Sequence, residues 1–247
     1  MSGELIAYVL AVYLVAGCLK GVVGLGLPTI SLALLATVLG LKEAMILLII
    51  PSFITNLVQA ISGPNFIIIV RRVWFFLLPL CLLAWWSTGI LIEANTAVLK
   101  AGLGGILIIY AIISLGDVRI KSFGKYEFWM APFFGGLTGI STGLTGTFAV
   151  PGVFYLQALG LKKDAFVQAM GICFTVATAA LAVSLGGRGV VSEELTILSA
   201  VAVIPALIGM KVGSKIRKNL PETMFRKFFF IALLFLGGWI SFRSGLF

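Results

Sequence analysis

Residues 17–29 read GCLKGVVGLGLPT, and residues 139–151 read GISTGLTGTFAVP. Both stretches space their glycines as G-x-x-x-G-x-x-G, carry a proline a few residues later, and interrupt an otherwise apolar run. Glycine frees the backbone, whereas proline lacks an N–H donor and prevents a helix from continuing on its N-terminal side. Each stretch is therefore predicted to end one helix and to begin another, with Pro28 and Pro151 in the first turn of the new helix.

The composition around these breaks predicts an all-α polytopic membrane protein. Of the 247 residues, 60% are hydrophobic and 11% are charged, and the mean hydropathy is +1.15. The apolar runs are continuous, whereas a β-barrel would alternate polar and apolar residues. The 18 Lys and Arg residues outnumber the 9 Asp and Glu residues and lie between the apolar runs. The positive-inside rule explains this excess, and we expect no nucleic-acid partner because no binding motif accompanies it.

The residues that most metal sites and buried active sites require are missing from the sequence. The chain has no histidine and no C-x-x-C, and its three cysteines lie in apolar runs. We therefore expect no metal and no cofactor. Every carboxylate falls at a segment end or in a loop, which argues against an enzyme embedded in the membrane and against a proton relay of buried acids.

The chain divides into two halves, 1–120 and 121–247, that we predict to be membrane repeats. The second apolar segment of each half is too short to span a bilayer of about 30 Å. We expect it to be a short helix that packs against its predecessor as a hairpin or re-entrant element. The ten predicted segments are 5–24, 28–40, 43–62, 73–92 and 98–116, followed by 128–147, 149–160, 165–186, 193–212 and 226–244.

Two features recur in both halves. The three motif glycines match at an offset of 122 residues, and LGLK occurs at 39–42 and again at 159–162. Because five segments per half is an odd number, the second half must enter the membrane from the opposite side. The sequence thus predicts an inverted-topology repeat, as in many secondary transporters. The positive-inside rule then places most Lys and Arg residues in the cytoplasm and both termini outside it.

If both hairpins end near the middle of the bilayer, the N-termini of the two short helices converge there. Helix N-termini offer unpaired N–H groups and a partial positive charge, which suit an anion. We therefore predict an anion site near the midplane. The candidate substrate-binding residues are Lys20, Gly24, Gly26, Pro28, Thr29, Asn56, Gln59, Thr142, Gly143, Thr145, Gly146, Pro151, Gln168 and Thr175.

Each kind of candidate has a structural alternative. A lysine within a membrane segment costs several kcal/mol unless it is paired or hydrated, so Lys20 either attracts the anion or snorkels to the interface. Threonine hydroxyls either donate to the anion or bond their own helix. Asn56 and Gln59 lie on a polar stripe and either face a cavity or bond a neighbouring helix. The motif glycines either free the backbone or let helices pack closely, and for Gly102, Gly237 and Gly238 we expect packing.

The two breaks carry a resemblance to a known family. GCLKGVVGLGLPTISLALL at 17–35 and GLTGTFAVPGVFYLQALGLKKDAFVQAMGICFT at 143–175 resemble the sulfite exporter TauE/SafE family, and the resemblance covers nearly the whole chain. It implies an inner-membrane carrier of small sulfur oxyanions or organosulfonates, such as sulfite or sulfoacetate, and most often an exporter. By motif match, the break glycines and prolines, Lys20 and the polar stripes would line the path.

The expected function is thus a secondary transporter of a small anion, most simply an exporter of sulfite or an organosulfonate. An anion that leaves an inside-negative cell moves downhill by about 2.3 kcal/mol per charge per 100 mV, so export needs no buried acid. The alternatives are an uptake carrier for another small organic acid or oxyanion, and an anion channel. The oligomeric state, including a homo-oligomer, stays open.

Overall fold

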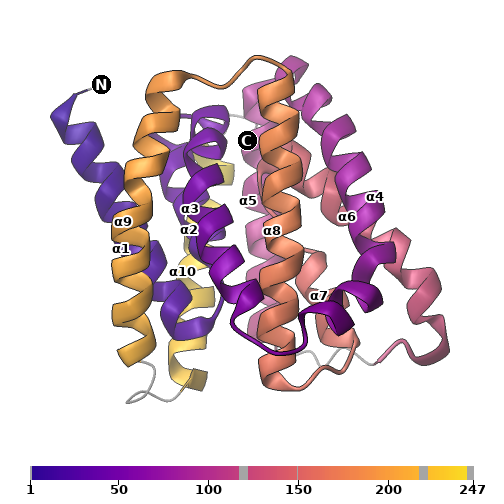
Figure 1. Ribbon diagram of the computed structural model, residues 1–247. Helices are drawn as coiled ribbons and strands as arrows, with labels where there is room; N and C mark the ends of the chain where they lie inside the picture. Colours follow the sequence, from indigo (N-terminus) through magenta and orange to yellow (C-terminus); the bar gives the residue numbers. More distant parts are fainter. Residues whose placement is uncertain (1, 117–121, 149, 217–221, 244–247) are drawn as a thin grey trace. The chain divides into compact units, whose positions relative to one another are not determined.

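The computed structural model describes residues 2–116, 122–148, 150–216 and 222–243, and these residues form α-helices, one 3-10 helix and no strand (Figure 1). The all-α prediction is confirmed. Six of the described helices are long and apolar enough to cross a membrane, namely α1, α3, α4, α5, α8 and α9.

The helices follow the predicted segments closely. They are α1 (Gly3–Val23), α2 (Leu27–Val38), α3 (Leu41–Ile61), α4 (Phe66–Glu93), α5 (Thr96–Leu115), α6 (Glu127–Thr145), α7 (Gly152–Ala158), α8 (Lys163–Gly187), α9 (Glu193–Ile216) and α10 (Glu222–Arg243).

Three helices begin three or more residues from the predicted position, and one of them is α10, which begins at Glu222 rather than at 226. α4 starts at Phe66, well before residue 73, so that Arg71 and Arg72 lie within its early turns. The apolar run indicated the later start because charged residues usually mark the end of a membrane segment. α7 starts at Gly152 rather than at 149, with Pro151 as its N-cap residue.

The helices form two compact units that interleave the sequence halves. The first unit comprises α1, α2, α5, α9, α10 and α3 as far as Pro51, and the second comprises α3 from Ser52 together with α4, α6, α7 and α8. Each unit therefore takes helices from both halves. The two membrane repeats at 1–120 and 121–247 stay a prediction.

In the first unit, α1 runs parallel to α9 along a glycine seam (Figure 1). A Cβ at Gly17 would overlap the Ala206 carbonyl, and a Cβ at Gly21 would overlap the Met210 carbonyl. The contacts advance in the same direction along both helices, so the two helices are parallel. Because glycine has no side chain, the two backbones can approach this closely.

In the second unit, α6 runs parallel to α4 in the same way (Figure 1). A Cβ at Gly139 would overlap the Leu80 carbonyl, and a Cβ at Gly143 would overlap Ala84 and Ser87. The motif glycines of each half thus face a helix that carries an internal proline, Pro205 in α9 and Pro79 in α4.

The proline within α3 has a specific compensation in the first unit. Pro51 cannot donate to the carbonyl of Leu47, its partner four residues earlier in a regular helix. The hydroxyl of Ser199 on α9 donates to that Leu47 carbonyl at 2.8 Å and accepts the N–H of Ile50 at 3.3 Å. A side chain from another helix therefore satisfies a group that would be costly to leave unpaired away from water.

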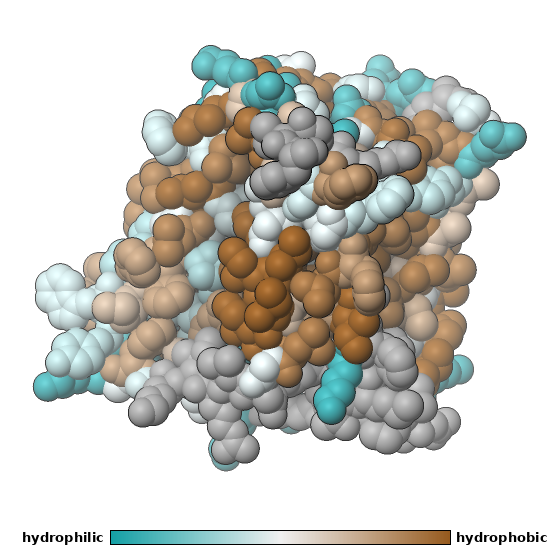
Figure 2. Space-filling model, turned by 180° about the vertical axis from the view of Figure 1, so that it is seen from behind, coloured by the Kyte–Doolittle hydropathy of each residue, from teal (hydrophilic) through white to brown (hydrophobic). Residues whose placement is uncertain are grey.

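Apolar side chains also cover much of the outer surface, as the face in Figure 2 shows. Along α4, Trp74, Leu78, Leu82 and Trp86 recur about once per turn and are between 50% and 62% exposed. Such a stripe of large apolar side chains suits contact with lipid and not with water.

Candidate functional site

The first break separates α1 from α2 by a turn of left-handed glycines. Gly24 (φ 84°) caps α1 and donates its N–H to the carbonyl of Lys20 at 2.7 Å. Gly26 (φ 109°) then precedes α2, whose second residue is Pro28. Only glycine adopts such angles without strain. The predicted position of Pro28, in the first turn of the short helix, is confirmed.

The short helix α2 folds back along α1 and makes a hairpin. The Tyr8 hydroxyl, near the start of α1, donates to the carbonyl of Leu34 in α2 at 3.0 Å. The turn of this hairpin brings Lys20 and Thr29 to its closed end. Both side chains are only 3% exposed.

The burial of Lys20 favours one of its two alternatives. A lysine that snorkels keeps its ammonium at the surface and buries only its carbon chain. The whole side chain of Lys20 is instead buried in the last turn of α1, beside the glycine turn. A cation held there is suited to attract an anion.

The second break repeats the glycine cap of the first. Gly146 (φ 71°) caps α6 and donates its N–H to the carbonyl of Thr142 at 2.8 Å. Thr142 thus takes the place that Lys20 has in the first break, and it is fully buried. Pro151 lies one residue before α7, just outside the first turn where the sequence predicted it.

The second short helix, α7, also folds back on its predecessor. A Cβ at Gly152 would lie 3.1 Å from the Thr138 side chain on α6, and the rings of Tyr155 and Phe134 are 6.0 Å apart. Both short helices end in the LGLK turn, where Gly40 (φ 106°) and Gly160 (φ 63°) are left-handed. The two predicted hairpins are therefore present, one in each unit.

The candidate threonines of the second unit bond their own helices. The hydroxyl of Thr142 donates to the Thr138 carbonyl at 2.7 Å, and that of Thr145 donates to the Ser141 carbonyl at 2.8 Å. Thr175 donates to the Gly171 carbonyl at 2.7 Å. A hydroxyl has one proton, so in this arrangement these residues can accept from a ligand but not donate to it.

Thr147 is the hydroxyl at the second break that the candidate set missed. It is 2% exposed, and its Oγ1 has no hydrogen-bond partner among the described residues. Its backbone is held by Ser141, whose hydroxyl donates to the Thr147 carbonyl at 2.8 Å. In the sequence, its position directly after Gly146 suggested a role, but the neighbouring threonines lie equally close to the break.

Two glutamines, one on α3 and one on α8, join these helices by hydrogen bonds within the second unit. Gln59 donates to the Val167 carbonyl at 2.8 Å. Gln168 donates to the carbonyls of Ala60 and Gly63 at 2.8 and 2.6 Å, and its Oε1 accepts the N–H of Asn65 at 3.1 Å. The interhelical alternative accounts for both side chains, and their contact with substrate stays a prediction.

The candidate residues are divided between the two units. The first unit holds Lys20, Gly24, Gly26, Pro28 and Thr29. The second unit holds the others, Asn56, Gln59, Thr142, Gly143, Thr145, Gly146, Pro151, Gln168 and Thr175. Asn56 is fully buried in α3. Gly143 packs on α4, as the helix-packing alternative expects.

The described residues show no group of metal ligands, and aromatic side chains fill the pocket beside the second break. No group of three or more His, Cys, Asp or Glu side chains that could hold a metal occurs within the described parts of the chain. Beside the second break, Phe76, Phe148 and Phe174 pack against Thr138 and Cys173 and leave no room for a water molecule. The distinctive chemistry is therefore the buried cation and the glycine turn of the first break.

Comparison with known proteins gives one match. The family model described as "Sulfite exporter TauE/SafE" matches residues 9–240, nearly the whole chain. No curated protein and no solved structure matches it.

Proposed function

The chain belongs to the sulfite exporter TauE/SafE family, and on this premise we propose that it is a secondary transporter that exports sulfite or an organosulfonate across the inner membrane. One observation supports an anionic substrate more than any other. Lys20 is buried beside a glycine turn that opens onto the start of α2. The ammonium group and the first N–H groups of that helix both attract negative charge.

We assign the second break to the same path because a left-handed glycine caps its helix as in the first break. There the Thr147 hydroxyl, which has no partner among the described residues, is the donor that an oxyanion would use. The proposal that both breaks serve one anion near the middle of the bilayer rests on the sequence repeat. The membrane potential is then the simplest driving force, since it supplies about 2.3 kcal/mol per charge per 100 mV in the outward direction.

Flux through proteoliposomes tests this function. We expect saturable flux of sulfite or sulfoacetate that rises with an imposed potential and does not change with sodium or pH. Lys20→Met, which removes the charge at similar volume, is the matched control. Its flux should saturate only at a higher substrate concentration than that of the wild type. Flux that never saturates would identify an anion channel, and dependence on a sodium gradient would point to coupled uptake. Absence of flux for both anions would overturn the sulfur substrate.

We further propose that the ends of the chain lie outside the cytoplasm, as the charge distribution predicts. Lys215 at the end of α9 and Glu93 at the end of α4 are exposed and would lie on opposite sides. In a chain with Cys18, Cys81 and Cys173 replaced by alanine, Lys215→Cys should react with an impermeant maleimide only from the cytoplasm. Glu93→Cys should react only from outside, and the reverse pattern would overturn the orientation.

A further inference from the structure

The second unit holds a cavity whose lining includes no residue of either helix break. Its volume is about 320 Å³, and it lies between the first turns of α4 and the residues that begin α6. The residues that give the cavity its chemistry are Arg71, Arg72, Trp74, Lys125, Glu127 and Tyr155.

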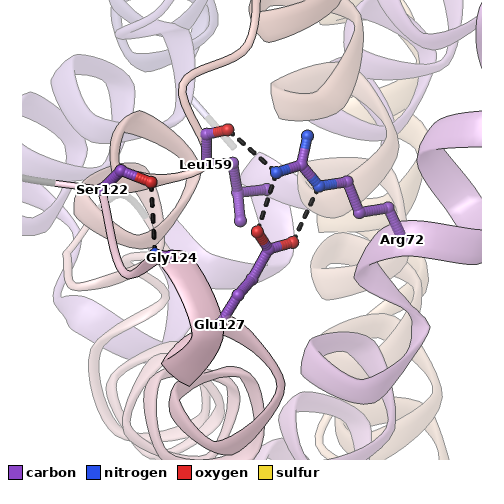
Figure 3. Close-up of polar contacts among 5 residues, drawn as sticks. All are labelled: Arg72, Ser122, Gly124, Glu127 and Leu159. Atoms are coloured by element: carbon purple, nitrogen blue, oxygen red, sulfur yellow. Dashed lines mark hydrogen bonds and ion pairs between the residues drawn. The ribbon is translucent and has the colours of Figure 1, made fainter.

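The charges around the cavity leave a positive surplus. Glu127 accepts two hydrogen bonds from Arg72, at 2.7 and 2.8 Å, and Arg72 also donates to the Leu159 carbonyl at 3.0 Å (Figure 3). Arg72 and Glu127 therefore neutralise each other and fix this wall. Arg71 and Lys125 remain, and Glu127 is the only carboxylate among the described residues of the lining.

Tyr155 supplies an unused hydrogen-bond donor at the same cavity. Its side chain is fully buried, and its hydroxyl has no partner among the described residues. Its ring stacks on Phe76 at 4.7 Å between centroids and lies 6.1 Å from Phe123. A buried hydroxyl without a partner costs about 1–3 kcal/mol, so an incoming acceptor would be stabilised here.

The remaining lining indicates the depth of the cavity in the membrane. Trp74 and Phe128 are 50% and 54% exposed, and the rings of Phe75 and Phe128 are 4.3 Å apart. Aromatic side chains gather where the hydrocarbon of a bilayer meets the headgroups, and α4 is a candidate membrane span that begins here.

We propose that this cavity binds the phosphate of an anionic phospholipid. Arg71 and Lys125 pair with the phosphate, the Tyr155 hydroxyl donates to one of its oxygens, and the aromatic side chains contact the glycerol and the upper acyl chains. The aromatic lining favours a lipid over free phosphate, since a free ion would gain nothing from it. None of the cavity's lining residues is among those assigned to the path of the transported anion.

Native mass spectrometry of the full-length protein in detergent tests this site. The probes are phosphatidylglycerol, phosphatidylcholine and inorganic phosphate, each added without transport substrate. We expect retention of phosphatidylglycerol well above phosphatidylcholine and no retention of phosphate alone. Equal retention of the two lipids, or retention of phosphate alone, would overturn the proposal.

Variants locate the binding within the protein. Arg71→Gln and Lys125→Gln should each weaken retention of phosphatidylglycerol about fivefold, the effect of one basic residue at a membrane surface. Tyr155→Phe keeps the stacked ring and should weaken retention by a smaller factor. Lys215→Gln, an exposed lysine outside the lining, is the charge-matched control and should bind as the wild type does. Unchanged retention in the double variant Arg71→Gln with Lys125→Gln would overturn the site.

Discussion

The two helix breaks share a capping glycine and differ in the side chain beside it and in the segment that follows it. Helix α2 begins three residues after Gly24, and α7 begins six residues after Gly146. In each break, a left-handed glycine donates its N–H to the carbonyl four residues earlier, from Gly24 to Lys20 and from Gly146 to Thr142. The first of these carbonyls belongs to a buried cation and the second to a hydroxyl that bonds its own helix. Two breaks with the same glycine cap can therefore differ in chemistry, and we infer that only the first break supplies charge.

The largest effect should come from neutralising the first break. Lys20→Met should weaken sulfite binding tenfold to a hundredfold, because a charged hydrogen bond contributes about 1.5–3 kcal/mol. Thr142→Val at the equivalent place should change it less than about twofold, since the Thr142 hydroxyl donates its one proton to the Thr138 carbonyl and has none for the anion. Half-saturation of sulfite flux measures both, and thermal unfolding in detergent shows whether each variant folds. Equal losses at the two positions would contradict the asymmetry.

A smaller effect should come from the seams, where the two breaks are alike. Gly21→Ala pushes a methyl group into the α9 backbone, and Gly143→Ala pushes one into α4. Each should destabilise the protein by about 1–3 kcal/mol through overpacking. The measurement is the thermal unfolding temperature in detergent.

Gly105→Ala in α5 is the matched control for the seams. A Cβ there meets nothing within 4 Å, so alanine should be neutral or should stabilise the helix by up to about 1 kcal/mol. If Gly143→Ala left the unfolding temperature unchanged while Gly21→Ala lowered it, the two seams would differ.

Local features of the fold were predictable, and contacts between distant residues were not. The breaks, both hairpins and both LGLK turns follow from glycine and proline, whose effects act within a few residues. The hydrogen bonds of the glutamines between α3 and α8 could not be predicted. The sequence around Gln59 gives no sign that Val167, far along the chain, is its partner. The prediction that Gly102 and Gly238 serve packing is wrong, since a Cβ at either meets nothing within 4 Å. Spacing alone does not tell which face of a helix has a neighbour.

The candidate site was likewise predictable in part. The burial of Lys20 and the turn that follows it agree with the sequence, because a lysine within an apolar run is conspicuous. The sequence could not single out Thr147, because four other hydroxyl side chains lie around the same break. Only the hydrogen bonds distinguish it, since its hydroxyl has no partner among the described residues.

The glycine seams also bear on the order in which the chain is made. The seam face of α1 packs on α9, and the two helices are about 190 residues apart in the sequence. At 5–20 residues per second, roughly 10 to 40 seconds of synthesis separate them. Helix α1 must therefore remain in the bilayer as a finished helix with its glycine face against lipid. Insertion of α1 and its packing on α9 are thus separate events, and the N-terminal helix is among the first to insert and among the last to complete its glycine seam.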